Sequence, residues 1–238
     1  KRRFRQIQRV LYMKRCAIIL AAGRGTRMGS LTDEYPKGLL NTGDKSPVES
    51  QFANLKKCRI SDVCILTGYR REAFNHLQCN KIHNGSWKKS NMVFSLNKAF
   101  EWGTPFDQVI VSYSDIFFDI TALDHLMTSE EDISITYDVN WQELWEKRFG
   151  KPLEDAETFK INSDNWLIEI GKKPTELNEI EGQYMGLLSF NKRGWKIFNN
   201  FFATLSPEQK MTLDMTSILN MIVEEKLTKI KCLPFNKK

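Results

Sequence analysis

The chain has 238 residues, of which 41% are hydrophobic, and this suits one globular domain with a sizeable core. Its net charge of +6 comes from residues 1–15, which hold seven Lys or Arg and no acid, whereas the remainder carries 28 basic and 29 acidic side chains. The basic excess belongs to one terminal segment, which argues against a nucleic-acid-binding domain. No apolar run approaches the ~20 residues that a transmembrane helix needs.

Residues 1–15 are predicted to form a basic N-terminal extension of a single domain over residues 16–238. Apolar side chains recur there at helical spacing, at Phe4, Ile7, Val10 and Leu11. Such a segment fits an amphipathic arm for a membrane surface or a partner. It also fits an extension that packs on its own domain, which we favour.

The five cysteines are odd in number and irregularly spaced, and no C-x-x-C pair occurs. The sequence therefore indicates neither a zinc site nor a redox motif. The charged first residues are not followed by the apolar segment of a secretory signal. We expect free thiols in a reducing cytoplasm.

Apolar β-branched runs alternate with helical periodicity through the first half of the chain. In chain order we predict a strand at 16–21, a helix at 47–58, a strand at 62–67, helices at 71–78 and 91–102, a strand at 108–113, a helix from Thr121 and a strand at 133–138. Continuous apolar strands that alternate with helices indicate a mostly parallel sheet covered on both faces. The predicted fold class is α/β, with a Rossmann-like sheet flanked by helices.

The pattern changes from about Ala156 onward. Segments 158–161 and 166–170 flank the turn sequence NSDN and predict a β-hairpin. Further along we predict a strand at 184–190, helices at 193–205 and 213–225, and a last strand at 228–233. The second half is therefore expected to add antiparallel parts to the parallel sheet.

In the stretch LAAGRGTRMG the first predicted strand ends and a loop rich in glycine and positive charge begins. Ligands of open parallel sheets bind where strands release their carboxyl ends, and glycine there lets backbone N–H groups approach phosphate oxygens. The glycines and cations are Gly23, Gly25, Gly29, Arg24, Arg27 and Lys37. They predict a polyphosphate site. The Walker pattern G-x-x-x-x-G-K-[ST] is absent, and the third glycine of G-x-G-x-x-G falls one position late, so a dinucleotide site is disfavoured.

The string LAAGRGTRM followed by PKGLL resembles the signature of the nucleotidyltransferases that activate sugar phosphates and phosphocholine. VCILTGYRREAF and SNMVFSL resemble segments of the phosphocholine cytidylyltransferase branch, and VIVSYSDIFF occupies the place of a strand that ends in a metal-binding aspartate. YDVNWQELWEKRF, PLEDAETFK, EIGKKP and GQYMGLLSF look closest to enzymes that transfer CMP to phosphonates or phosphorylated metabolites. The resemblance implies a GT-A-like nucleotidyltransferase fold whose antiparallel second half binds the acceptor.

The resemblance implies that an acceptor oxygen attacks the α-phosphorus of a nucleoside triphosphate, and that Mg²⁺ shares the charge. Arg27 would hold the β- and γ-phosphates, Lys37 the α-phosphate and the attacking anion, and Asp115 the Mg²⁺. The other nucleotide-binding candidates are Leu20, Ala21, Ala22, Gly23, Gly25, Thr26, Gly68, Tyr69 and Ser114. A routine strand-to-helix turn is the alternative for Gly68 and Tyr69, and a helix cap is the alternative for Asp115.

The acceptor-binding candidates are Trp141, Asp155, Glu157, Lys173, Gln183 and Tyr184. Trp141 and Trp145 share a helical face, which suits either a cation–π contact with an ammonium or core packing. Asp155 and Glu157 would offset the charge of an amine; the alternative is an ordinary solvated cluster. Asp214 is either a further site carboxylate or a helix N-cap.

We therefore expect a CTP-dependent cytidylyltransferase whose acceptor is a small amine-bearing phosphonate or phosphate monoester, with 2-aminoethylphosphonate as first choice. The alternatives are phosphoglutamine, 2-hydroxyethylphosphonate or phosphocholine as acceptor, a sugar-1-phosphate nucleotidyltransferase, and a non-catalytic nucleotide-sensing domain. Related enzymes continue past the LPFNKK end of this chain into a W-x-E-V-D segment with a second metal-binding aspartate. We accordingly expect a domain truncated at its C-terminus, and a fused second domain or a second copy of the chain as partner.

Overall fold

The computed structural model describes residues 13–41, 43–150 and 152–235. Predictions for residues 1–12, and for the last three residues of the chain, lie outside the described residues. The central sheet consists of β1 (Arg15–Ala21), β2 (Asp62–Thr67), β3 (Asn80–His83), β4 (Gln108–Tyr113), β5 (Ile133–Asp138), β8 (Gln183–Asn191) and β9 (Ile230–Phe235).

The seven strands have the order β3-β2-β1-β4-β8-β5-β9. Only β8 runs antiparallel to its neighbours β4 and β5, and the other pairs are parallel. In β1, Cys16 pairs with Asp62 on one side and with Val109 on the other. This topology confirms the predicted α/β fold with a mostly parallel sheet. It also places the carboxyl ends of β1, β2 and β4 at one edge of the molecule.

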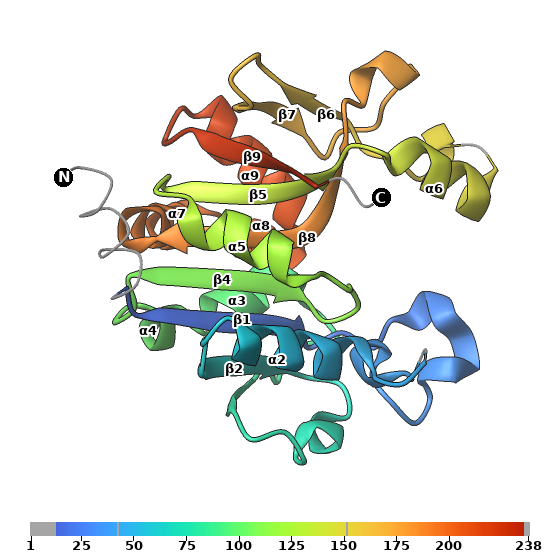
Figure 1. Ribbon diagram of the computed structural model, residues 1–238, viewed down its shortest axis with the longest axis vertical. Coiled ribbons are helices and arrows are strands. Elements are labelled where there is room, and N and C mark those ends of the chain that lie inside the picture. Colours follow the sequence, from blue (N-terminus) through green and yellow to red (C-terminus); the bar gives the residue numbers. More distant parts are fainter. Residues whose placement is uncertain (1–12, 42, 151, 236–238) are drawn as a thin grey trace.

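Helices cover both faces of the sheet (Figure 1). One face carries α2 (Pro47–Lys57) and α5 (Ile120–Thr128). The other carries α3 (Met92–Asn97), α4 (Phe100–Gly103), α7 (Lys192–Thr204), α8 (Pro207–Thr212) and α9 (Met215–Glu224). Each face has its own cluster of buried apolar side chains. Strands buried on both faces read as continuous apolar runs, and for this reason β2 and β4 have their predicted bounds. The predicted bounds of β5 also hold, although its buried run alternates Ile with Ser and Thr.

Two smaller parts extend from the sheet. The predicted hairpin is confirmed as the antiparallel pair β6 (Phe159–Ile161) and β7 (Leu167–Ile170), and it covers the outer edge of β9, where Trp166 bridges Lys231. Helix α6 (Trp141–Phe149) projects from the end of β5 (Figure 1). Short 3₁₀ turns complete the chain at η1 (Thr26–Thr32), η2 (Lys37–Leu39), η3 (Arg71–Phe74), η4 (Pro152–Glu154) and η5 (Leu177–Glu179).

The structure corrects three of the predicted helical segments. The helix expected at 71–78 is a single 3₁₀ turn, because the chain enters it from a left-handed residue, Arg70, and then leaves to form β3. The helix expected at 91–102 is divided between α3 and α4, with Ala99 in a non-helical conformation. The helix expected at 213–225 starts at Met215 because Asp214 caps it. The short elements β3 and α8 had no predicted counterpart.

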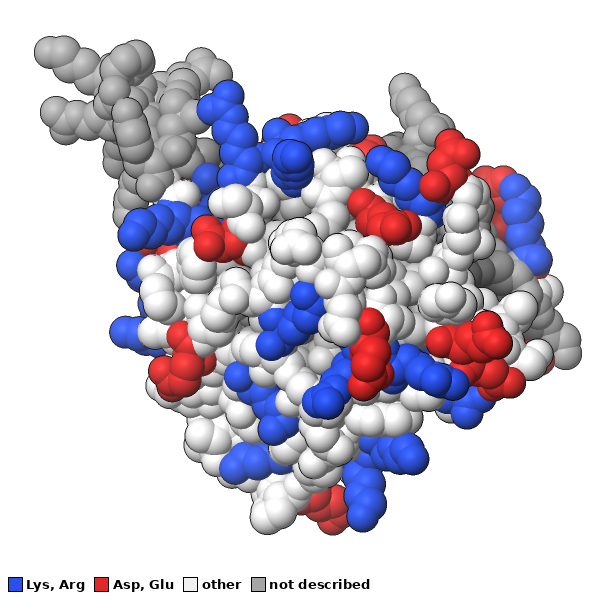
Figure 2. Space-filling view, turned by 90° about the horizontal axis from the view of Figure 1, so that it is seen from below, with Lys and Arg blue, Asp and Glu red and all other residues white. Residues whose placement is uncertain are grey.

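Basic and acidic side chains are both scattered over the face shown in Figure 2, with basic side chains more frequent in its lower half. The pattern agrees with the near-balance of charge outside residues 1–15. Among the described residues, no helix has both the length and the apolar character that crossing a membrane requires.

Candidate active site

The glycine-rich loop after β1 turns sharply toward Lys37. Gly25 adopts a left-handed conformation with φ of 76°, and a Cβ atom there would lie 3.0 Å from the Cβ of Lys37. Glycine at this position therefore supplies both the backbone angle and the room that the lysine stem needs. The loop continues into η1, on which Thr26 and Arg27 are exposed.

The far end of this loop is fastened to the segment that follows β2. Tyr69 Oη donates to the carbonyl oxygens of Thr32 at 2.9 Å and Asp33 at 2.7 Å. The Asp33 carboxylate forms an ion pair with Arg24, whose guanidinium lies 5.6 Å from the centroid of the Tyr69 ring. Tyr69 thus anchors the loop, and its ring packs edge-on against Trp87 at 5.3 Å.

Gly68 is required by close packing between two strand ends. A Cβ atom there would overlap the carbonyl oxygen of Ala22 and would lie 2.6 Å from the Cβ of Trp87. The next residue, Tyr69, donates its backbone N–H to the same Ala22 oxygen at 2.9 Å. Gly68 and Tyr69 therefore support the site through close packing and a backbone hydrogen bond to Ala22.

Lys37 and Asp115 meet at the carboxyl edge of the sheet. The Nζ atom of Lys37 lies 2.5 Å from the Oδ2 atom of Asp115. Their side chains are 42% and 29% exposed, so both remain open to a ligand. Gly38 lets the two segments approach, because a Cβ atom there would lie 2.7 Å from the Cβ of Ser114.

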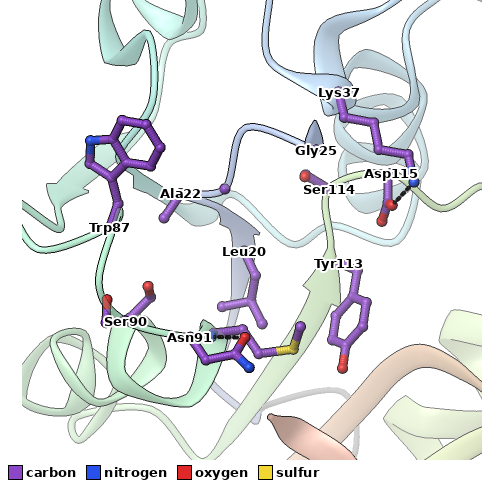
Figure 3. A pocket seen from close by; sticks show the side chains of 13 residues that line it. Leu20, Ala22, Gly25, Lys37, Trp87, Ser90, Asn91, Tyr113, Ser114 and Asp115 are labelled. Atoms are coloured by element: carbon purple, nitrogen blue, oxygen red, sulfur yellow. Dashed lines mark hydrogen bonds and ion pairs between the residues drawn. The ribbon is translucent and has the colours of Figure 1, made fainter. Parts of the chain in front are cut away.

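These residues border a cavity of about 260 Å³. In Figure 3, Lys37 and Asp115 stand on one side of the cavity and Trp87 stands on the opposite side, with Leu20 and Ala22 between them. The predicted site residues brought together in its lining are Leu20, Ala22, Gly23, Gly25, Lys37, Ser114 and Asp115. Ala21, by contrast, belongs to the core.

Six lining residues were not among the candidates, namely Trp87, Ser90, Asn91, Met92, Ser95 and Tyr113. Asn84 organises part of this wall, since its Nδ2 atom donates to the hydroxyl oxygens of Ser90 and Ser95 at 2.9 Å each. The segment SNMVFSL carried a signal for this wall through its resemblance to the phosphocholine branch. No comparable sequence signal pointed to Trp87.

The predicted aromatic site at Trp141 lies in a small apolar cluster. Trp141 is 4% exposed and packs with Ala156 and Ile180, next to Trp145. This burial favours packing over ammonium binding. Lys173 holds the neighbouring turn η4, because its Nζ atom donates to the carbonyl oxygens of Leu153 and Glu154 at 2.6 Å each.

A second polar cluster lies at the antiparallel end of the molecule. Glu157 is partly buried, and the Gln183 amide donates to its backbone oxygen at 2.7 Å. Burial raises the pKa of the Glu157 carboxyl, Asp214 raises it further, and a hydrogen bond with Thr216 lowers it. The exposed Asp155 is a smaller influence on the same carboxyl.

Of the two roles that the sequence left open for Asp214, the structure shows the helix N-cap. It caps α9 by accepting from the backbone N–H of Ser217 at 2.8 Å, and it accepts from the Thr216 hydroxyl at 3.2 Å. It also lies close enough to Glu157 to perturb the pKa of that carboxyl.

The rings of Tyr113 and Tyr184 meet edge to face at 5.9 Å. Burial raises the pKa of Tyr113, and nearby acids, with Asp214 first, raise it further. Tyr113 lines the cavity and is also within electrostatic range of Asp214 and Glu157.

Among the described residues, no group of three or more His, Cys, Asp or Glu side chains could hold a metal ion alone. Mg²⁺ usually takes one or two carboxylates together with substrate phosphates and water. Asp115 fits such a site, because it offers hard oxygen donors at the cavity edge.

Residues 17–155 match the model of the MobA-like NTP transferase domain. The chain belongs to this family. A MobA-like NTP transferase is a nucleotidyltransferase, so the expectation of an enzyme of this class is confirmed. The CTP:phosphoglutamine cytidylyltransferase of Campylobacter jejuni is 32% identical over 224 residues, or 88% of both chains. The choline-phosphate cytidylyltransferase of Streptococcus pneumoniae is 37% identical over 84 residues, or 34% of this chain and 37% of the relative.

Solved structures show the same fold at lower sequence identity. The inositol-1-phosphate CTP transferase from T. maritima superposes with a TM-score of 0.73 at 19% identity, covering 94% of this chain and 86% of that one. The CTP:phosphocholine cytidylyltransferase from Streptococcus pneumoniae superposes with a TM-score of 0.72 at 20% identity, covering 94% and 91%. At this level of identity, these neighbours support the architecture alone.

Proposed function

We propose that this MobA-like NTP transferase is a CTP-dependent cytidylyltransferase that transfers CMP to a small phosphoryl-bearing acceptor. The observation that carries the proposal is the meeting of Lys37 and Asp115 at the mouth of the cavity below the glycine-rich loop. The choice of CTP is supported by the C. jejuni relative, which aligns over most of both chains.

In the proposed reaction an acceptor oxygen forms a bond to the α-phosphorus of CTP. The bond from that phosphorus to the bridging oxygen breaks, and pyrophosphate leaves with the electron pair. The protein contributes no covalent step, so its work is to bring two anions together and offset their charge. In this proposal Lys37, at the cavity edge, contacts the α-phosphate and the attacking oxygen, and Arg27, exposed on the loop, binds the outer phosphates.

Asp115 would hold the Mg²⁺ ion, which supplies charge neutralisation when it is bound with the nucleotide. Lys37 at present satisfies one oxygen of Asp115. Once Mg²⁺ is bound to the Asp115 carboxylate, the Lys37 ammonium group would be free to turn toward a phosphate. The pair thus keeps both side chains extended toward the cavity.

We propose phosphoglutamine as the first acceptor to test, ahead of the 2-aminoethylphosphonate favoured from the sequence. The relative named for phosphoglutamine is 32% identical along 88% of this chain, whereas the Lancefieldella rimae relative named for 2-aminoethylphosphonate is 36% identical over only 26% of it. Both acceptors carry an amine. Glu157 and Asp214 are the carboxylates that would receive it, beside Tyr113.

The test is the rate of pyrophosphate release with CTP and Mg²⁺ for a panel of acceptors. The panel contains phosphoglutamine, 2-aminoethylphosphonate, phosphocholine, 2-hydroxyethylphosphonate and glucose-1-phosphate. We expect the two primary amines to react fastest, with phosphoglutamine first, because an ammonium group can donate hydrogen bonds to both carboxylates. Faster release with 2-hydroxyethylphosphonate or glucose-1-phosphate would overturn the proposed acceptor class.

A further inference from the structure

Helix α2 presents a glutamine in the middle of its apolar face. Its buried residues include Val48, Gln51 and Leu55, which recur at the spacing of one helical face. Gln51 is 1% exposed. An amide in such a position is tolerated only when its polar atoms find hydrogen-bond partners.

The partners of Gln51 all belong to the end of β4 and the turn that follows it. Its Nε2 atom donates to the carbonyl oxygens of Tyr113 and Ile116 at 2.8 Å each. Its Oε1 atom accepts from the hydroxyl of Ser112 at 2.8 Å. Both amide hydrogens and the amide oxygen are therefore used within one five-residue stretch.

The two carbonyl groups that accept from Gln51 flank Ser114 and Asp115. One amide thus bridges the turn that projects the Asp115 carboxylate toward Lys37. On its other side the turn packs against Gly38, where even a methyl group would be too close to Ser114. The turn is held between the helix amide and the lysine loop.

We infer that Gln51 is a positioning residue that sets the Asp115 carboxylate relative to Lys37. The inference rests on the proposed function, in which Asp115 holds the metal with the nucleotide. Without the amide bridge, the turn loses the contacts on both sides of Asp115, while the apolar packing of α2 is preserved by a side chain of similar shape. The expected defect is one of metal use.

The test compares Gln51→Met with Asn54→Leu. Asn54 lies one turn further along α2 and donates to the Phe118 carbonyl at 2.7 Å, three residues beyond Asp115. Each substitution removes one side-chain amide that links α2 to the segment after β4. Of the two residues, only Gln51 contacts the turn that carries Asp115. The readouts are the Mg²⁺ concentration for half-maximal rate, and the gain in CTP affinity on adding Mg²⁺, measured by calorimetry.

We expect Gln51→Met to raise the half-maximal Mg²⁺ concentration by about 10- to 100-fold, the range found when partners of a metal ligand are removed. CTP affinity without Mg²⁺ and the KM for the acceptor should change little. Asn54→Leu should leave the Mg²⁺ dependence near that of the unmodified chain. If Gln51→Met does not fold, Gln51→Asn removes one methylene, cannot span both carbonyls and is expected to show the same shift.

An unchanged Mg²⁺ dependence in the Gln51 variant, or an equal shift in both variants, overturns the inference. Asp115→Asn separates this failure from failure of the proposed function. If Asp115→Asn weakens Mg²⁺ use while the Gln51 variant does not, only the positioning role is wrong. If Asp115→Asn leaves Mg²⁺ use intact, the metal role of Asp115 is wrong and the role of Gln51 falls with it.

Discussion

Lys37 and Arg27 carry the positive charge that the proposed reaction needs, and neither supports the core. We expect Lys37→Ala and Arg27→Ala each to lower the rate of pyrophosphate release by about 100- to 1,000-fold, as loss of one well-placed transition-state donor does. Both side chains are at least partly exposed on short 3₁₀ turns, and an exposed ion pair such as that of Lys37 contributes little, so the free energy of unfolding should change by about 1 kcal/mol or less. Lys57→Ala, on the exposed face of α2, is the control. Near-native rates in both loop variants would remove the phosphate-site assignment.

Glu157 makes a pH dependence of acceptor binding predictable. Burial raises the pKa of its carboxyl above the ordinary glutamate value of 4.5. Only the ionised form attracts an ammonium, so the KM for an amine-bearing acceptor should rise as the pH falls through the raised pKa. Glu157→Gln should have a high KM at every pH. Asp155→Asn, at an exposed position, should keep the pH dependence.

The same raised pKa makes a prediction of opposite sign for stability. A carboxyl whose folded-state pKa is raised lowers the free energy of unfolding as the pH rises above 4.5, because the folded state then bears an unfavourable charge. We therefore expect Glu157→Gln to be more stable than the unmodified chain at neutral pH, in chemical denaturation, while it binds the acceptor less tightly. A variant that loses stability as well as acceptor binding would contradict the electrostatic role.

The residues of the site differ in how far the sequence could place them. Lys37 and Asp115 could be predicted to converge, because each follows a parallel strand and carboxyl ends of parallel strands share one edge. Trp87 could not, because its position depends on the short polar strand β3. Trp141 shows the opposite problem, since helical spacing alone does not distinguish a ligand-binding face from the packed cluster in which it lies.

At the scale of elements, α2 is the helix that supports the site, and its start is well defined. Ser46 Oγ accepts from the Glu49 backbone N–H at 3.3 Å, and the Glu49 carboxylate accepts from the Ser46 backbone N–H at 2.9 Å. We expect Ser46→Ala to lower the free energy of unfolding by about 0.5–2 kcal/mol in urea, with an unchanged m value. Ser206→Ala, which removes the matching cap from the six-residue helix α8, should cost less. Equal losses of unfolding free energy in the two variants would mean that the N-cap of α2 stabilises the fold no more than the N-cap of the short helix α8 does.

The stability loss expected for Ser46→Ala should depend on pH, because the hydrogen bonds between Ser46 and Glu49 also set the pKa of Glu49. Hydrogen bonds from the Ser46 backbone and side chain lower the pKa of Glu49. A carboxylate with a lowered pKa stabilises the fold above its ordinary pKa of 4.5, and the contribution is lost as the pH falls through its folded-state pKa. The difference in stability between Ser46→Ala and the unmodified chain should therefore narrow below pH 4.5.

Strands buried on both faces were predictable to the residue, whereas short polar elements were not. The bounds of β2 and β4 follow from apolar runs that end at polar or turn residues, and those of β5 from a β-branched run, ISITYD, that ends at an aspartate. β3 has only one partly buried residue in four, and its place depends on pairing with β2. The segment 71–78 has helical periodicity, but a left-handed residue and the return to β3 decide its path. Tertiary contacts outweigh local propensity in such short segments.

At the scale of the whole molecule, the antiparallel strand β8 brings three distant parts of the chain near one another. β8 lies between β4 and β5, and the Tyr113–Tyr184 contact joins the β4 and β8 ends at the cavity. The glycine-rich loop, the Asp115 turn and the Glu157 cluster thereby approach from three parts of the chain. Order of strands could not be derived from the sequence pattern, because an apolar run does not specify its neighbour.

The most direct measurement is pyrophosphate release with phosphoglutamine and Mg²⁺ in the presence of CTP, UTP, dTTP, ATP or GTP, each supplied separately at the same concentration. The proposed function predicts release with CTP at a rate at least about tenfold above that with any other nucleotide, a difference of about 1.4 kcal/mol in transition-state binding. Comparable release with all five, or faster release with UTP, dTTP, ATP or GTP than with CTP, would contradict it.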